Sequence, residues 1–99
     1  MLVHTVYFWL NETLSQEDRA DFLEEVKTLD GIAEVDAFYL GTPAATPDRS
    51  VIDASYDASI TVILKDMAAH DIYQEHPIHQ KFIANNASRW SKVQVYDAD

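Results

Sequence analysis

The sequence contains no cysteine and only two glycines, and its seven lysines and arginines stand against seventeen acidic residues. Without cysteine the chain has no disulfide, no thiolate nucleophile and no cysteine-ligated zinc, a composition that fits a cytoplasmic protein. Its formal charge of −10 repels phosphate backbones and anionic lipids. We therefore expect no nucleic-acid partner and no membrane partner.

Long hydrophobic runs and known catalytic signatures are also missing. The longest apolar run, at residues 6–10, is far shorter than the ~20 residues of a membrane span, and the N-terminus lacks the basic start of a signal peptide. The chain has no glycine-rich phosphate loop, no Ser-His-Asp order and no metalloprotease signature. We expect a soluble, intracellular protein with no cofactor and no resident metal.

What is present is typical of one folded domain over residues 1–99. Hydrophobic residues make up 47% of the chain and charged residues 24%, as in ordinary globular proteins. Apolar periodicity and capping residues predict strands at 2–10, 35–41, 56–65 and 90–97, and helices at 15–29, 66–73 and 77–89. This βαββαβ order predicts an α+β, ferredoxin-like antiparallel sheet with its helices on one face.

The first predicted strand is apolar on both of its alternating faces. Helices of such a fold cover only one face of the sheet, so Val3, Tyr7 and Trp9, or the opposite set, need cover from elsewhere. A homodimer that packs sheet against sheet is the simplest source of that cover. The polar loop at 41–50 would suit a lid or a dimer contact.

Residues 73–82 hold the candidate chemistry. Pro77 suits the first position of a helix, which places His79 in the first turn, where unpaired amides and the helix dipole disfavour a positive imidazole. A lowered pKa keeps His79 neutral and able to accept a proton near neutral pH. Tyr73 can present its phenol to the same space as a hydrogen-bond donor to an oxyanion. His79 and Tyr73 are therefore the candidate catalytic pair.

Two other interpretations of this stretch remain open. In the first, His76 caps the helix, His79 packs in its first turn, and the neighbouring aromatic residues belong to the core. In the second, a metal is bound by residues that share a helical face and by one distant histidine: His76, His79, Glu75 and His4. The second interpretation requires His76 to lie within the helix.

The remaining candidates are a histidine on an apolar strand and two tryptophans. Burying the imidazole of His4 costs free energy unless it is hydrogen-bonded, so we expect a partner or a small polar cavity and include His4 among the substrate-binding residues. Trp9 and Trp90 can line a ligand pocket or be plain core. His70, on the short helix, is expected to face solvent.

Four segments together resemble a known family: VHTVYF at 3–8, LGT at 40–42, Y-x-x-HP-x-H-x-x-F at 73–82 and KVQVYD at 92–97. Over nearly its whole length the chain resembles the stress-responsive dimeric α/β-barrel (Dabb) domain. The resemblance implies ferredoxin-like monomers that dimerise through their sheet faces to form an α/β barrel. Such a dimer would also cover the open face of the first strand.

The resemblance extends to a plant polyketide cyclase of this family. Its tyrosine and histidine, which promote an aldol closure, fall on Tyr73 and His79, and its pocket tryptophan falls on Trp90. In that chemistry a base removes a proton from a carbon between two carbonyls, while a phenol holds the base or the enolate oxygen. The chain departs from the cyclase at Ala58 and Val26, which are histidine and tyrosine there. The cyclase's apolar pocket wall corresponds to Val6, Phe8, Phe22, Ile60, Val62, Val93 and Val95.

Most of the family has no assigned reaction, and two functions of different classes follow. The first is a dimer that binds a small hydrophobic or carbonyl-rich metabolite between sheet and helices without turnover. The second is a cofactor-free enzyme with His79 as base and Tyr73 as hydrogen-bond donor. It would act by cyclase-like proton transfer or, as in related dimeric barrels, by cofactor-independent monooxygenation of a phenol. Polar groups converging on His79 favour an enzyme, and a packed histidine favours a structural role.

Overall fold

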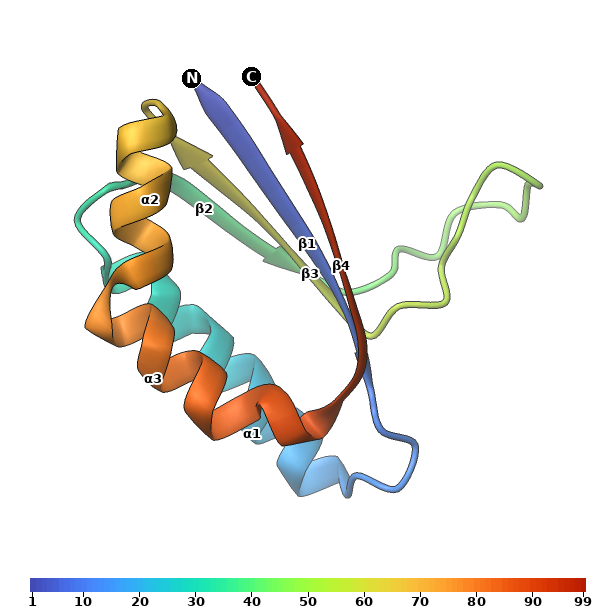
Figure 1. The fold of residues 1–99 in the computed structure, drawn as a ribbon. Coiled ribbons are helices and arrows are strands. Elements are labelled where there is room, and N and C mark those ends of the chain that lie inside the picture. The colour runs from blue at the N-terminus through green and yellow to red at the C-terminus, as the bar shows by residue number, and fades with distance from the viewer.

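Four strands form one antiparallel sheet in the order β2-β3-β1-β4. The computed structural model describes residues 1–99. All three helices lie on one side of the sheet (Figure 1), which confirms the predicted ferredoxin-like α+β fold. The elements are β1 (Leu2–Leu10), α1 (Gln16–Lys27), β2 (Val35–Gly41), β3 (Ala58–Leu64), α2 (Met67–Glu75), α3 (Pro77–Asn86) and β4 (Trp90–Ala98), with 3₁₀ turns at Thr28–Gly31 and Ala87–Arg89.

Strand β1 lies between β3 and β4, and its two faces differ. Every second side chain, from Leu2 to Leu10, is buried under the helices, and the side chains between them are half-buried on the other face. In the antiparallel register His4 lies opposite Val62 of β3 and opposite Asp97 of β4. Partners in a register point to the same side of a sheet, so these three residues all face the helices.

The first helix begins as predicted and ends earlier than predicted. The Ser15 hydroxyl accepts a hydrogen bond from the Asp18 amide at 3.0 Å, which satisfies one of the free amides at the start of α1. The helix was expected to reach Leu29 but stops at Lys27, where the chain tightens into a 3₁₀ turn. This turn brings both Leu29 and Ile32 into the core, each with 1% of its surface exposed.

Helices α2 and α3 are separated by a single residue, His76. A residue before proline is disfavoured in the helical conformation, and His76 is extended, with φ −61° and ψ 140°. Its Nδ1 atom accepts a hydrogen bond from the Ile78 amide at 3.0 Å and so caps α3. Helix α2 runs to Glu75, two residues beyond its predicted end, and the last predicted turn of α3, up to Arg89, is 3₁₀.

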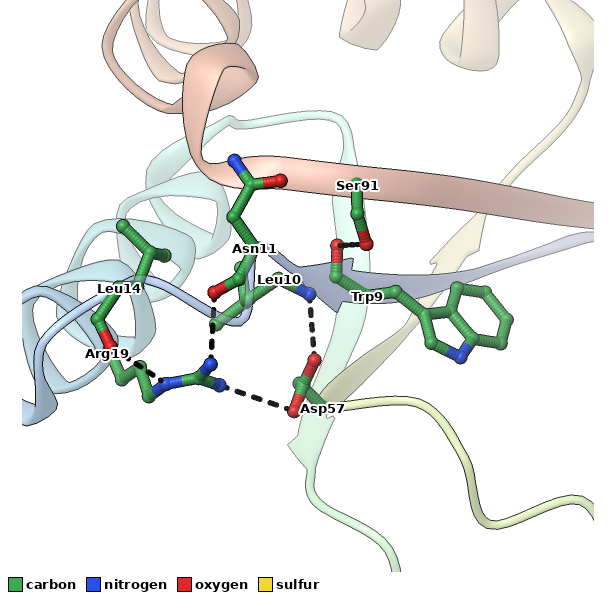
Figure 2. A network of polar contacts seen from close by, with 7 residues as sticks. All are labelled: Trp9, Leu10, Asn11, Leu14, Arg19, Asp57 and Ser91. Atoms are coloured by element: carbon green, nitrogen blue, oxygen red, sulfur yellow. Dashed lines mark hydrogen bonds and ion pairs between the residues drawn. The ribbon is translucent and has the colours of Figure 1, made fainter.

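A polar network fixes the end of β1 where the helix layer begins (Figure 2). The Arg19 guanidinium donates to the carbonyls of Asn11 at 3.0 Å and Leu14 at 3.4 Å, and it pairs with the Asp57 carboxylate at 3.4 Å. The other oxygen of Asp57 accepts a hydrogen bond from the Leu10 amide at 2.7 Å. The strand predicted from residue 56 begins at Ala58, directly after Asp57.

The opposite face of the sheet carries no helix, and the long segment between β2 and β3 extends on that side (Figure 1). Its end packs on β1, where Tyr56 contacts Tyr7 with ring centroids 4.9 Å apart and Ser55 Oγ accepts a hydrogen bond from Trp9 Nε1 at 3.0 Å. The roles expected for residues 41–50, a lid or a dimer contact, stay predictions. None of the helices has the length and apolar character needed to span a membrane.

Candidate functional site

A cavity of about 120 Å³ lies between the sheet and helices α2 and α3. Side chains of β1, β3, β4, α2, α3 and the first 3₁₀ turn form its walls, and most of them are apolar. Nine residues proposed from the sequence line it: His4, Val6, Phe8, Ile60, Tyr73, His79, Trp90, Val93 and Val95. Three strands and two helices thus converge on one space.

Two residues proposed for the pocket wall lie behind it. Phe22 and Val62 are fully buried, and Phe22 supports the wall through an edge contact with Phe8, at a centroid distance of 5.3 Å. Ala58 and Val26, the positions at which the chain departs from the plant cyclase, are also fully buried and do not line the cavity. Differences from the cyclase at these two positions act on the core that supports the cavity.

Tyr73 of α2 lines the cavity and is fully buried. Its hydroxyl has no hydrogen-bond partner in the protein. Burial raises the pKa of this phenol, so it is neutral and carries a proton that it can donate. A buried hydroxyl without a partner is unfavourable, which makes this oxygen a point at which a bound molecule would gain a hydrogen bond.

His79 of α3 packs its ring edge-on to Tyr73, with ring centroids 4.9 Å apart. Burial lowers the pKa of His79, and positive charge on His4 and His70 lowers it further. The lowered pKa of His79 agrees with the sequence prediction. Its main physical cause is burial, whereas the sequence prediction named the helix dipole. A neutral imidazole next to a neutral phenol is suited to proton transfer or to hydrogen bonding with an uncharged ligand.

Trp90, the first residue of β4, forms another wall of the cavity. Its ring contacts Phe8 and Phe82 at centroid distances of 5.4 Å and 5.9 Å. The indole Nε1 is buried and has no hydrogen-bond partner, as is true of the Tyr73 hydroxyl. Two residues that line the cavity therefore each have a buried donor that the protein itself does not satisfy.

His4 has the partner that its burial requires. Only 4% of its surface is exposed, and Asp97 accepts a hydrogen bond from its Nδ1 atom at 2.5 Å. The side-chain nitrogen of Gln74 lies 3.5 Å from His4 Nε2. The imidazole is thus held between β4 and α2, and the expected hydrogen-bonded partner is confirmed.

The predictions for the other two histidines, His70 and His76, had different outcomes. His70 was expected to face solvent, and this is wrong: only 17% of its side chain is exposed, and its ring packs edge-on to His4 at 5.6 Å. His76 caps α3 with its Nδ1 atom, as the first alternative held, so it lies outside the helix that the proposed His76, His79, Glu75 and His4 metal site required. A different group, His4, His70 and Asp97, offers three ligand atoms within 4.8 Å of one another.

Four lining residues were missed as part of a pocket, namely Leu29, Gln74, Phe82 and Ile83. Gln74 is the polar one among them. The predicted end of α2 at Tyr73 leaves Gln74 outside the helix. In the observed helix, which is two residues longer, Gln74 shares a face with His70 four residues earlier, and this spacing is the signal that could have found it.

A second depression, of about 320 Å³, lies on the open face of the sheet. Tyr7, Trp9 and Tyr96 line it together with Asp53 and Tyr56 of the long loop. Although this depression is larger, we assign the candidate site to the helix-side cavity. That cavity alone contains buried polar groups without partners and a histidine with a perturbed pKa.

Comparison with known families matches residues 2–99 to the stress responsive A/B barrel domain, Dabb. The chain belongs to the Dabb family. No match was found among curated proteins.

Solved structures share the fold of this Dabb chain. A Dabb protein with a ferredoxin-like fold from Mesorhizobium loti is 24% identical, with a TM-score of 0.75 and coverage of 99% of this chain and 94% of that one. A dimeric ferredoxin-like protein of unknown function from Jannaschia is 25% identical, with a TM-score of 0.76 and coverage of 99% and 97%. The hydroxynitrile lyase of Passiflora edulis is 19% identical, with a TM-score of 0.80 and coverage of 98% and 90%.

Proposed function

We propose that this Dabb protein binds a small, mainly apolar molecule that carries a carbonyl or phenolic oxygen in the cavity between the sheet and helices α2 and α3. The observation that carries the proposal is the pair of unpartnered donors at the cavity, Tyr73 Oη and Trp90 Nε1. Leaving a buried donor unpaired costs about 1–3 kcal/mol, and a ligand oxygen that reached either group would remove that cost there. The apolar walls would supply the rest of the affinity through burial of the ligand's hydrocarbon part.

The uncovered edge of the sheet gives such a ligand a way in. Val93 and Val95 of β4 face the helix side, since they pair with Phe8 and Val6 of β1, yet they are 37% and 42% exposed. No helix covers them, so the cavity opens along this edge. The ligand would enter beside β4 and place its oxygen inward, toward Tyr73.

Tryptophan fluorescence tests the proposal, because each face of the sheet has one tryptophan. In Trp9→Phe the cavity residue Trp90 is the sole tryptophan, and in Trp90→Phe only Trp9, on the open face, remains. We expect saturable changes with small phenols or 1,3-dicarbonyl compounds in the first variant and none in the second. The proposal is contradicted if no compound in such a panel gives saturation in Trp9→Phe, or if both variants respond alike.

The neutral state of His79 supports a second function, cofactor-free proton transfer. We infer that His79 could take a proton from the carbon between two carbonyls, while the Tyr73 hydroxyl donates a hydrogen bond to the developing enolate oxygen. The Passiflora lyase shows that a protein of this fold can catalyse a reaction, which keeps the enzyme class open. Oxygenation of an electron-rich phenol would use the same two residues and stays the alternative reaction.

Exchange of the carbon-bound proton with deuterated solvent, followed by NMR, separates an enzyme from a binding protein. For a bound 1,3-dicarbonyl compound we expect exchange faster than in buffer alone, loss of that acceleration in His79→Ala, and a loss of about tenfold or more in Tyr73→Phe. Binding without accelerated exchange would leave the binding function and remove the enzymatic one.

We also propose that two copies pack through their open sheet faces. That face carries an aromatic group in which Tyr7 contacts Tyr56 and Tyr96, and Tyr96 and Tyr39 are 63% and 66% exposed. Exposed apolar patches of this kind mark interaction surfaces. The Jannaschia relative is described as dimeric, which supports the same arrangement here.

A further inference from the structure

We propose that His4, His70 and Asp97 form a binding site for Zn²⁺ at the end of the sheet, next to the cavity. The three residues come from β1, α2 and β4, and each offers one ligand atom, all within 4.8 Å of one another. This site shares only His4 with the metal set considered from the sequence. It does not depend on a molecule occupying the cavity.

The donor set suits zinc. Two imidazole nitrogens and one carboxylate oxygen are ligands that Zn²⁺ prefers, and three protein ligands leave a fourth tetrahedral position for water or another oxygen. The group itself contains no sulfur ligand, which favours zinc over copper(I). The formal charge of −10 further favours binding of a cation.

The positions of the three side chains need only small changes to hold the ion. His4 Nδ1 and Asp97 Oδ1 lie 2.5 Å apart, and tetrahedral zinc with bonds of ~2.0–2.2 Å would separate them to roughly 3.4 Å. Asp97 can move outward, because it lies near the end of β4 and 43% of its side chain is exposed. His70 is already beside His4, with ring centroids 5.6 Å apart.

Neighbouring groups can orient both imidazoles. When zinc takes the place of the proton between His4 and Asp97, that proton moves to His4 Nε2. Gln74 Nε2 lies 3.5 Å away, and a half-turn of this side-chain amide brings its oxygen into position to accept the proton. On the other ring, His70 Nδ1 lies 3.1 Å from Asp71, which leaves Nε2 free to bind the metal. Such outer partners are typical of zinc-binding histidines.

The exposure of the three side chains to solvent suits an exchangeable metal site. His4 is nearly inaccessible, His70 is 17% exposed and Asp97 is 43% exposed, so the group is buried on one side and open on the other. An ion can therefore enter from solvent and still be held by a buried, oriented imidazole.

Calorimetric titration of untagged protein with Zn²⁺, together with the visible absorption of bound Co²⁺, tests the proposal. We expect one ion per chain, with affinity reduced about a hundredfold or more in His70→Ala and in Asp97→Asn, and about tenfold in Gln74→Leu. Asp99→Asn, two residues farther along the chain, and His76→Asn, which keeps a residue able to cap α3, are expected to bind as the wild type does.

The proposal is overturned if no saturable binding occurs, if His70→Ala and Asp97→Asn bind zinc with unchanged affinity, or if His76→Asn abolishes binding. Far-ultraviolet circular dichroism of each variant identifies loss of the fold. If a variant unfolds, the Co²⁺ spectrum of the wild type decides: intense tetrahedral bands support the site, and the weak octahedral spectrum of the hydrated ion contradicts it. The cavity proposal is tested separately, by fluorescence of Trp9→Phe in the presence of a chelator.

Discussion

The two tryptophans of the chain lie on opposite faces of the same sheet and differ in how their indole nitrogens are satisfied. Trp9, on the open face, donates a hydrogen bond to Ser55 of the protein's own loop, and Lys92 lies 4.6 Å above its ring. Trp90, on the helix side, is enclosed by aromatic rings and its nitrogen has no partner. The protein itself thus satisfies Trp9 on a face that carries exposed aromatic side chains, whereas Trp90 lies in an apolar enclosure and lacks a polar partner.

This difference assigns a separate role to each face. A surface with exposed aromatic side chains gains from cover by a second apolar surface, which suits association of two copies. A mainly apolar cavity lined by residues with unpaired donors selects a small molecule with an oxygen acceptor. The predictions below change one face at a time, and each is expected to leave the other face intact.

The largest effect is expected on association, from a charge at the centre of the open face. Thr61 of β3 lies opposite Thr5 and Tyr39 on that face, and Thr61→Arg would bring two like charges together in a symmetric dimer. Because such a contact costs several kcal/mol, we expect dimerisation to weaken about a thousandfold or more. Sedimentation velocity measures this, and Ala84→Arg on the exposed surface of α3 is the charge-matched control. A Thr61→Arg protein that stays dimeric would place the interface elsewhere.

On the helix side, the largest effect is expected on folding. Phe82 is 2% exposed and contacts Phe8, Phe22 and Trp90, so Phe82→Ala is expected to lower the free energy of unfolding by about 3–5 kcal/mol. Both variants are made in Thr61→Arg, which is expected to be monomeric. There, Tyr96→Ala on the open face should change the free energy of unfolding by about 0.5 kcal/mol or less, since that side chain is 63% exposed. Urea unfolding compares the two variants. Equal losses would mean that the two faces are not distinct in the monomer.

The pH dependence of stability tests the environment of His79. Its pKa is lowered from the ordinary value of 6.5 by burial and by His4 and His70, so the unfolded chain binds this proton more tightly than the folded chain. The contribution to stability is therefore full above pH 6.5 and declines as the pH falls below 6.5, until the folded group also titrates. Between about pH 7.5 and pH 5.5 we expect the free energy of unfolding to fall less in His79→Gln than in the wild type, with both proteins measured without metal. If the free energy of unfolding varies with pH in the same way in both proteins, His79 is not desolvated.

Much of this arrangement could be predicted from local patterns. The alternation of β1 identifies its two faces, and Ser15, Asp66 and Pro77 each begin a helix as their residue types predict. The need of a buried His4 for a partner follows from the same kind of argument, because the cost of an unpaired imidazole does not depend on the fold.

The parts that could not be predicted depend on where α2 lies above the sheet. His70 looks like a surface residue in a short polar helix, and only the packing of α2 over β1 brings its ring to His4. The same placement makes burial, rather than the helix dipole, the main cause of the lowered pKa of His79. Asp97 joins this group through the register between β1 and β4, which is a long-range feature that spacing along the chain does not reveal.

The most direct test of the account removes one oxygen atom from the cavity. In Tyr73→Phe the unpaired buried hydroxyl is lost and the ring stays, so we predict a free energy of unfolding about 1 kcal/mol higher and, for phenolic or dicarbonyl ligands, affinity reduced about tenfold. Tyr96→Phe, whose hydroxyl is on the open face, is the control and should change neither quantity. Urea unfolding and a fluorescence titration of the two variants, both made in Trp9→Phe, give the answer. A Tyr73→Phe protein that is less stable than its parent and binds ligands equally well would contradict the account.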